Sequence, residues 1–311
     1  MQSIAGQLFL AYSRLRMRSI ARWMADPASE QQRLLEHLLR SAARTRFGSD
    51  HDLGRARSVG DFQARVPLRQ FQDLKPYWDR LRAGERDLLW PGKIRLFAVT
   101  SGSTGEPKYV PVSDEGLQGF LRAGRDILSH YIVNTGDAEH FKGKFLYLGG
   151  ARELEAGLHG TMTSDLSGIV NEETPWAYRP FRLPTPRVHL VTGWEAKLEA
   201  VADEAWNADV RGVSGIPSWL VALFERVLQR RRAAGLPAEN IAQAWPNLGL
   251  LVHGGVSFDP YRDLFVQLIG KPVYNLEVYL CSEGFLALQD QPDSRDLLLR
   301  MDAGIFHEFV P

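Results

Sequence analysis

The stretch "FAVTSGSTGEPKYVPVSDEG", residues 97 to 116, places a run of glycines, hydroxyl side chains and one lysine between two apolar segments. The apolar segments predict a strand, a glycine-rich turn and a second strand. Glycines in such a turn adopt backbone conformations closed to other residues and can bring N–H groups close to an anion. The candidate donors are Thr100, Ser101, Gly102, Ser103, Thr104, Gly105 and Lys108. The stretch therefore predicts a phosphate-binding turn, and an ordinary Ser/Gly-rich hairpin is the alternative.

Other phosphate-binding and catalytic motifs do not match. A Walker A loop has glycine, four residues, then Gly-Lys-Ser/Thr leading into a helix, whereas Lys108 lies three residues beyond Gly105 and precedes a strand pattern. The sequence contains no Gly-x-Ser-x-Gly, His-Glu-x-x-His, Cys-x-x-Cys or Gly-x-Gly-x-x-Gly. P-loop kinases, serine hydrolases, zincins and Rossmann dehydrogenases therefore have no support from motifs.

The composition is that of a folded protein that handles small molecules. The chain has 311 residues with 44% hydrophobic content, and 37 Lys and Arg balance 37 Asp and Glu. This balance gives no argument for nucleic acid or a membrane as partner. The single cysteine, Cys281, is consistent with a reducing compartment, so we expect the cytoplasm. Arginines interrupt the apolar residues of 1–26, which predicts an amphipathic helix packed on its own domain, with a membrane-surface role as the less common alternative.

The pattern along the chain changes near residue 90. Residues 1–90 are predicted to be helical and to pack on the main domain: 30–48 form a helix that ends at Gly48, and 58–84 form two short helices broken at Pro67. Strands are predicted at 94–100, 108–112, 144–149, 208–214, 248–254, 272–280 and 304–310. Helices are predicted at 114–133, 194–206, 217–234 and 258–268. This alternation indicates an α/β fold with mixed sheets covered by helices.

Two segments carry a resemblance to a known superfamily. "TSGSTGEPK" (100–108) resembles the phosphate-binding signature of adenylate-forming enzymes, which include acyl-CoA synthetases, peptide-synthetase adenylation domains and luciferases; Ser103 replaces the usual threonine. "VYLCSEGFLALQ" (278–289) is similar to their Tyr-x-x-Ser/Thr-Glu element. The resemblance implies the large N-terminal domain of an adenylate-forming enzyme.

Further segments narrow the resemblance to one family. Residues 42–112, "GIPSWL" (215–220), "LVHGGVSFDPY" (251–261) and "GIFHEFVP" (304–311) together resemble the bacterial branch of the Gretchen Hagen, auxin-responsive family of acyl-acid-amido synthetases. Most of that family continues to a Tyr-Arg-x-Gly-Asp motif and a small C-terminal lid domain, and neither is in this sequence. We therefore expect residues 91–311 to be an incomplete nucleotide-binding core without its lid.

The resemblance implies a two-step ligase reaction that uses ATP and Mg²⁺. A small carboxylic acid and ATP form an acyl-adenylate, and an amine or amino acid then displaces AMP to form an amide. The alternative is a nucleotide-binding fragment without catalysis. The carboxylic acid and the amine cannot be read from the sequence.

The resemblance also implies roles for single residues. Lys108, Ser103 and Thr104 would stabilise the charge on the departing pyrophosphate, and Glu283 would hold Mg²⁺ unless it is a solvated strand-end carboxylate. The remaining expected nucleotide contacts are Gly254, Gly255, Tyr279 and Ser282.

Three further predictions rest on residue type and on position near the motifs. Trp219, Leu223 and Phe285 are candidates for an acyl pocket, with core packing as the alternative. His253 is either a base for the incoming amine or, more commonly for such a residue, a buried histidine. Cys281 is most simply a small packing residue.

Overall fold

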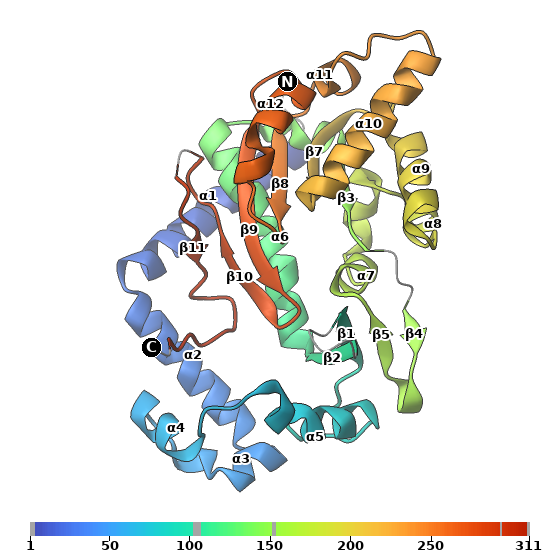
Figure 1. Ribbon diagram of the computed structural model, residues 1–311. Coiled ribbons are helices and arrows are strands. Elements are labelled where there is room, and N and C mark those ends of the chain that lie inside the picture. The colour runs from blue at the N-terminus through green and yellow to red at the C-terminus, as the bar shows by residue number, and fades with distance from the viewer. Residues whose placement is uncertain (1–3, 102–106, 151–153, 293, 310–311) are drawn as a thin grey trace.

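The computed structural model describes residues 4–101, 107–150, 154–292 and 294–309, with the backbone alone at residues 4, 5 and 101 (Figure 1). Its described strands form two sheets. The larger sheet has the order β11-β10-β9-β8-β7-β3-β6, and the smaller one has the order β2-β1-β5-β4. The strands are β1 (Leu96–Ser101), β2 (Pro107–Val112), β3 (Lys144–Leu148), β4 (Glu155–Ala156), β5 (Met162–Ser164), β6 (Arg182–Leu183), β7 (Val210–Gly215), β8 (Leu250–Gly254), β9 (Tyr274–Cys281), β10 (Gly284–Leu288) and β11 (Leu298–Leu299).

Helices precede the sheets and alternate with their strands. The α-helices are α1 (Ile4–Ala25), α2 (Pro27–Ala42), α3 (Arg46–Asp50), α4 (Val59–Arg65), α5 (Phe71–Arg82), α6 (Asp114–Thr135), α7 (Leu166–Glu172), α8 (Pro186–His189), α9 (Trp194–Ala205), α10 (Pro217–Ala233), α11 (Ile241–Ala244) and α12 (Arg262–Ile269). Short 3₁₀ turns are η1 (Leu53–Arg55), η2 (Ala138–Lys142), η3 (Leu158–Gly160), η4 (Trp176–Phe181) and η5 (Asp259–Tyr261). The mixed α/β fold with a helical N-terminal segment is confirmed.

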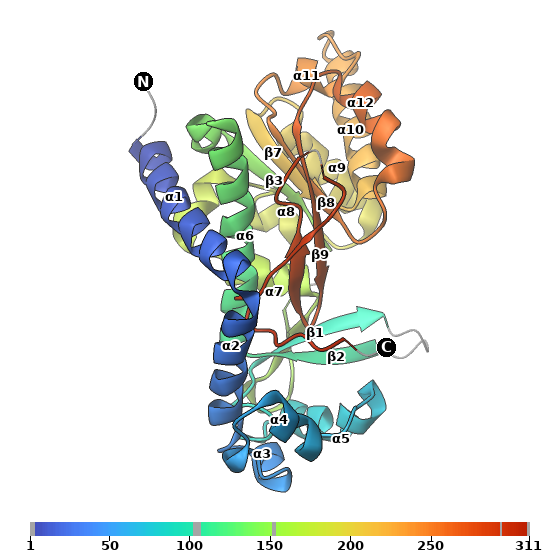
Figure 2. The same cartoon turned by 90° about the vertical axis from the view of Figure 1, so that its left-hand side faces the viewer.

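The larger sheet is the middle layer of three. Figure 2 shows α1 and α6 on one side of it and the helices from α8 to α12 on the other. The strands β6, β3, β7, β8 and β9 run parallel to one another. β10 pairs antiparallel with β9, and β11 pairs antiparallel with β10. Alternation along β8 divides the core, because Leu251 packs toward α10 while Leu250 and Val252 pack toward α6. Both faces of the parallel strands are therefore buried.

Local signals explain the element that follows the opening stretch. Ser113 caps α6, where its side chain accepts a hydrogen bond of 3.0 Å from the N–H of Gly116. Gly136 ends the helix in the left-handed conformation at φ 73°. The same helix carries Asp126, which is 1% exposed and anchors other parts of the chain. The first residues of α6 thus follow β2 directly and tie the smaller sheet to the core.

A buried ionic cluster joins three distant segments. Both Arg16 on α1 and Arg300 after β11 donate to Asp126, at 2.7 and 2.8 Å for Arg16 and 2.8 Å for Arg300. Arg16 also pairs with Asp302 at 2.7 Å. Arg300 is 2% exposed, so its charge is almost completely removed from water and the pairing with Asp126 compensates for this loss of hydration. The cluster fixes α1 and residues 300–302 onto α6.

Residues 304–309 differ from the prediction. The predicted strand at 304–310 is wrong for its described part, which forms no strand. The side chain of Gln31 on α2 donates to the carbonyls of Met301 and Ile305, at 2.8 and 3.2 Å, and accepts from the N–H of His307 at 2.8 Å. This side chain satisfies backbone groups that would otherwise need a neighbouring strand. Ile305 in turn packs against Gly284, where a Cβ would collide with its side chain.

Gly48 also differs from the prediction. The second helix ends at Ala42, and Gly48 lies inside α3 instead of capping α2. A Cβ at Gly48 would overlap the carbonyl oxygen of Ala42. The glycine therefore serves close backbone packing between α2 and α3.

Candidate functional site

The opening stretch forms the two predicted strands, β1 and β2. β1 and β2 pair antiparallel, with Thr100 opposite Lys108 and Ser101 opposite Pro107. Directly opposed residues share one face of a sheet, so Thr100 and Lys108 lie on the same face. Gly102, Ser103, Thr104 and Gly105 lie outside the described residues, as does the side chain of Ser101. The strands on either side of the predicted phosphate-binding turn are confirmed.

The hairpin rests on α5. Tyr109 lies under the guanidinium of Arg82, whose Cζ is 3.5 Å from the ring centroid. The Nζ atom of Lys108 lies 4.7 Å from the centroid of the Phe71 ring. Both cations thus contact an aromatic face between α5 and β2. The predicted catalytic lysine is positioned by an aromatic side chain that sequence reasoning did not single out.

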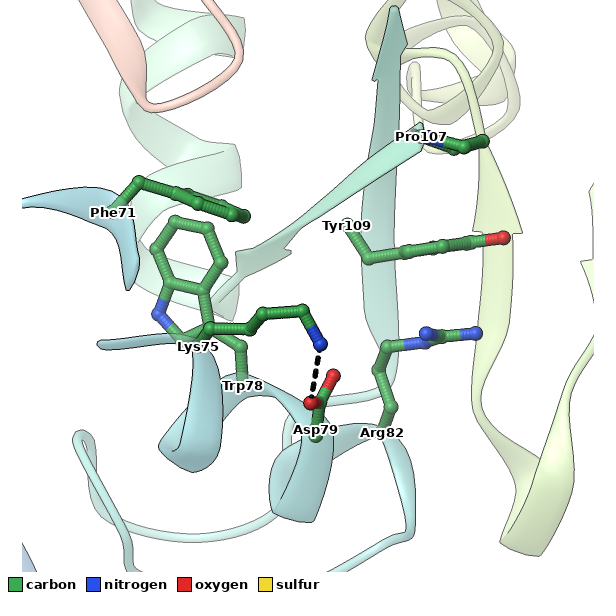
Figure 3. Close-up of a pocket in the computed structure, with 7 residues that line it drawn as sticks. All are labelled: Phe71, Lys75, Trp78, Asp79, Arg82, Pro107 and Tyr109. Carbon is green, nitrogen blue, oxygen red and sulfur yellow. Dashed lines mark hydrogen bonds and ion pairs between the residues drawn. The ribbon is translucent and has the colours of Figure 1, made fainter. Parts of the chain in front are cut away.

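A hollow of about 250 Å³ opens between α5 and β2 (Figure 3). It is lined by Phe71, Lys75, Trp78, Asp79, Arg82, Pro107 and Tyr109. Lys75 and Asp79 form an ion pair of 2.7 Å at its rim. Residues 71, 75, 78 and 82 follow the i, i+4, i+7, i+11 spacing of one helix face, and this spacing is the sequence signal that could have found the hollow. It adjoins the predicted phosphate-binding turn through Pro107.

The second predicted motif lies at the turn between β9 and β10. Tyr279 is 56% exposed on β9, and Glu283 is exposed in the turn. Ser282 is half-buried beside it. In both views the end of the β9–β10 hairpin lies next to the β1–β2 hairpin (Figures 1 and 2). The fold thus brings the two motifs, about 170 residues apart in sequence, to one region.

Cys281 has the properties of a packing residue. Its thiol lies 3.6 Å from the carbonyl oxygen of Gly284, within the turn. Burial raises the pKa of this thiol. A raised pKa disfavours the thiolate, which is the nucleophilic form.

Gly254 at the end of β8 and Gly255 directly after it each have a local structural reason. A Cβ at Gly254 would collide with the carbonyl oxygen of Val278 on the neighbouring strand β9. Gly255 adopts φ +84°, which other residues reach only with strain. These constraints account for both glycines without a ligand, and their expected contact with the nucleotide stays a prediction.

His253 is buried beside these glycines. It is 1% exposed, and its ring stacks on Phe258 with a centroid distance of 3.8 Å. Neither ring nitrogen has a hydrogen-bond partner among the described residues. Burial lowers the pKa of His253 to about 4. The imidazole is therefore neutral near pH 7 and keeps an unprotonated nitrogen, but its burial keeps both ring nitrogens away from solvent.

The three acyl-pocket candidates are not brought together. Trp219 and Leu223 belong to α10, where the Trp219 ring contacts the Trp194 ring in a tilted arrangement, with 4.7 Å between their centroids, and Leu223 is fully buried in the core. Phe285 packs in the cluster on the opposite face of the sheet, against α6. The prediction of one shared pocket is therefore wrong, because the sheet separates these residues. A contact of any single one with substrate stays a prediction.

Few of the described side chains near the two motifs could bind a metal ion. Among the residues that the structure describes, no group of three or more His, Cys, Asp or Glu side chains could hold a metal ion. Mg²⁺ usually keeps several waters and is bound through one or two carboxylates together with substrate phosphates. One exposed carboxylate at Glu283 fits that mode of binding and does not fit an all-protein cage.

Comparison with known proteins agrees with this geometry. The model of the GH3 family N-terminal domain matches residues 16–192. The chain belongs to the GH3 family. This is the family that the sequence motifs resemble, and the matched region includes the β1–β2 hairpin and the hollow beside it.

Relatives of the GH3 chain share its fold at low sequence identity. A jasmonoyl-L-amino acid synthetase, GH3.5, from Oryza sativa subsp. japonica is 27% identical over 122 residues, which cover 37% of this chain and 21% of that protein. The solved structure of the GH3.15 acyl acid amido synthetase superposes with a TM-score of 0.68 at 14% identity, covering 90% of this chain and 58% of the other. A 2-hydroxyisobutyryl-CoA ligase superposes with a TM-score of 0.53 at 15% identity, covering 86% and 57%. The GH3 chain therefore spans less than three-fifths of the length of each of these two solved structures.

No helix in the described part of the chain combines the length and the apolar character needed to cross a bilayer.

Proposed function

We propose that this chain is the nucleotide-binding part of an ATP-dependent acid–amine ligase that works through an acyl-adenylate. The observation that carries the proposal is the β1–β2 hairpin, which holds Thr100 and Lys108 in register on either side of the predicted phosphate-binding turn. The adjacent β9–β10 turn presents Glu283 to solvent in the same region. The family membership supports this assignment.

In the first proposed step, a carboxylate oxygen of the acid attacks the α-phosphorus of ATP. The bond to the bridging oxygen breaks, and pyrophosphate departs with the bonding electron pair. Lys108 and the hydroxyl of Thr100 would stabilise the negative charge that accumulates on the departing group. Glu283 would hold Mg²⁺, which would supply positive charge close to the phosphates when bound.

In the second proposed step, the amine nitrogen attacks the carbonyl carbon of the acyl-adenylate. AMP leaves, the amide bond forms, and the nitrogen loses a proton. His253 is a candidate proton acceptor because it is neutral near pH 7, and this role requires a ring nitrogen to become accessible, since the side chain is 1% exposed. The acid and the amine are small molecules whose identity the proposal leaves open.

The proposal is tested by exchange of labelled pyrophosphate into ATP, measured with Mg²⁺ across a panel of carboxylic acids. Exchange that requires one class of acid, and that falls at least tenfold in Lys108→Ala, supports adenylation. The matched control is Lys75→Ala, which removes a lysine at the rim of the hollow that no proposed step uses.

A second candidate function is nucleotide binding without turnover. It is favoured by the acyl-pocket candidates, because Leu223 and Phe285 lie on opposite faces of the sheet and form no shared pocket. ATP binding by calorimetry together with no exchange for any acid would support this candidate and overturn adenylation by the present chain.

A further inference from the structure

The exposed side of α1 carries more apolar surface than its own domain uses. The opposite side packs on α6 and contributes Phe9 and Leu10 to the core. On the exposed side, Leu8 is 68% exposed and Leu15 is 64% exposed, with Tyr12 between them at 38%. Residues 8, 12 and 15 follow the i, i+4, i+7 spacing and so form one stripe along the helix.

The stripe continues into a shallow aromatic hollow. A hollow of about 320 Å³ lies between α1 and η4 and is lined by Leu8, Phe9, Tyr12, Phe141, Ala177, Tyr178 and Phe181. Trp176, which precedes this part of η4, is 79% exposed. Two elements distant in sequence thus present a single apolar surface, which is the combination that marks an interaction site.

Positive charge borders the stripe. The helix contains four arginines and no acidic residue. Arg16 is committed to the buried ionic cluster, whereas Arg14, Arg18 and Arg22 are exposed and form no ion pair with another described residue. Successive residues of an α-helix are rotated by about 100° around its axis. With this rotation the three arginines lie together on one side of α1, beside Leu8 and Leu15.

From this arrangement we propose that the exposed side of α1 docks on an anionic bilayer surface. The charge complementarity decides the occupant: an apolar stripe bordered by arginines only, with an exposed tryptophan nearby, is typical of helices that lie in the interface of a charged bilayer. Arg14, Arg18 and Arg22 contact the headgroups, and Leu8, Leu15 and Trp176 enter the headgroup and acyl boundary. The docking is peripheral and requires no spanning segment.

This proposal goes beyond the packing expected from the sequence. The contacts of α1 with α6 occupy only one side of the helix. The uncovered side is the one that carries Leu8, Tyr12 and Leu15.

The test is flotation of the full chain with vesicles of phosphatidylcholine alone or of an equal mixture with phosphatidylserine. We expect flotation with the mixed vesicles, weakening as salt is raised, and little with phosphatidylcholine alone. Neutralising Arg14 and Arg18 together with glutamine should lower the partition coefficient about 25-fold, since each arginine near such a surface contributes about fivefold. Leu8→Gln with Leu15→Gln should abolish flotation.

The matched control is Val266→Gln, because Val266 is also 68% exposed but lies on α12. This variant should float like the unmodified chain. Circular dichroism melts check that all variants fold, which is expected because every altered side chain faces solvent.

Two results would overturn the proposal. One is flotation that is absent in the unmodified chain or unchanged in Leu8→Gln with Leu15→Gln. The other is a dimer, seen by light scattering, that becomes a monomer in the double leucine variant while no form floats. That second result would assign the stripe to another copy of this chain.

Discussion

Removal of Asp126 should destabilise the protein more than removal of any exposed carboxylate. The carboxylate is 1% exposed and accepts three charge-assisted hydrogen bonds of 2.7 to 2.8 Å from Arg16 and Arg300. In Asp126→Ala, Arg16 keeps Asp302 at 2.7 Å, but Arg300 stays 2% exposed with its charge unpaired by direct contact. Breaking a buried pair by removing one partner costs about 3–5 kcal/mol. We therefore expect a loss of about 4 kcal/mol in the free energy of unfolding.

The measurement is urea unfolding followed by tryptophan fluorescence, with the dependence on urea compared between variants. The matched control is Asp203→Ala, which breaks a surface pair with Arg230 of 2.5 Å in which Asp203 is 68% exposed. This control should cost less than about 1 kcal/mol. The double variant Asp126→Leu with Arg300→Met removes both buried charges and should recover a large part of the loss.

Two outcomes would refute this reasoning about the cluster. A loss below about 1 kcal/mol in Asp126→Ala would mean that water or a rearranged Asp302 satisfies Arg300 at little cost. A double variant whose loss equals the sum of its single variants would mean that the two side chains do not interact.

Three further predictions concern other parts of the fold. Burial lowers the pKa of His140 to about 4, whereas the pKa of a histidine in an unfolded chain is about 6.5. As the pH falls, the unfolded chain therefore binds this proton before the folded chain does. The free energy of unfolding should fall as the pH drops from about 6.5 to about 4. In His140→Met this slope, measured by urea unfolding at several pH values, should decrease by about 1.4 kcal/mol per pH unit. Gly254→Ala should lower the melting temperature, because its Cβ would collide with β9. Gly124 lies inside α6 with open space around it, so Gly124→Ala should raise the free energy of unfolding by roughly 0.5–1 kcal/mol and the melting temperature with it. Gln31→Ala should expose residues 301–307 to limited proteolysis, because three hydrogen bonds to their backbone are lost; unchanged cleavage would show that the ionic cluster alone holds this segment.

The sequence was most informative where local chemistry and periodicity agree. The paired strands β1 and β2, the capped helix α6 and the parallel strands β7 and β8 all follow from residues close together in the chain. The long helix α10 begins at Pro217, as its position in the first turn predicts.

Sequence reasoning failed where distant contacts decide the outcome. Residues 304–309 have a strand-like composition, but Gln31, more than 270 positions earlier, satisfies their backbone. The acyl-pocket prediction placed Leu223 and Phe285 together, and only the strand order shows that the sheet lies between them. The Asp126 cluster was missed for the same reason, since its arginines lie 110 and 174 positions away.

The contact between Gly284 and Ile305 links two positions that are separate in sequence. Gly284 directly follows Glu283, and Gln31 holds the backbone of Ile305. A methyl group at position 284 would need the space that the Ile305 side chain occupies. In the history of this family, the two positions should therefore change as a pair: a chain with alanine at the position of Gly284 should carry a side chain smaller than isoleucine at the position of Ile305.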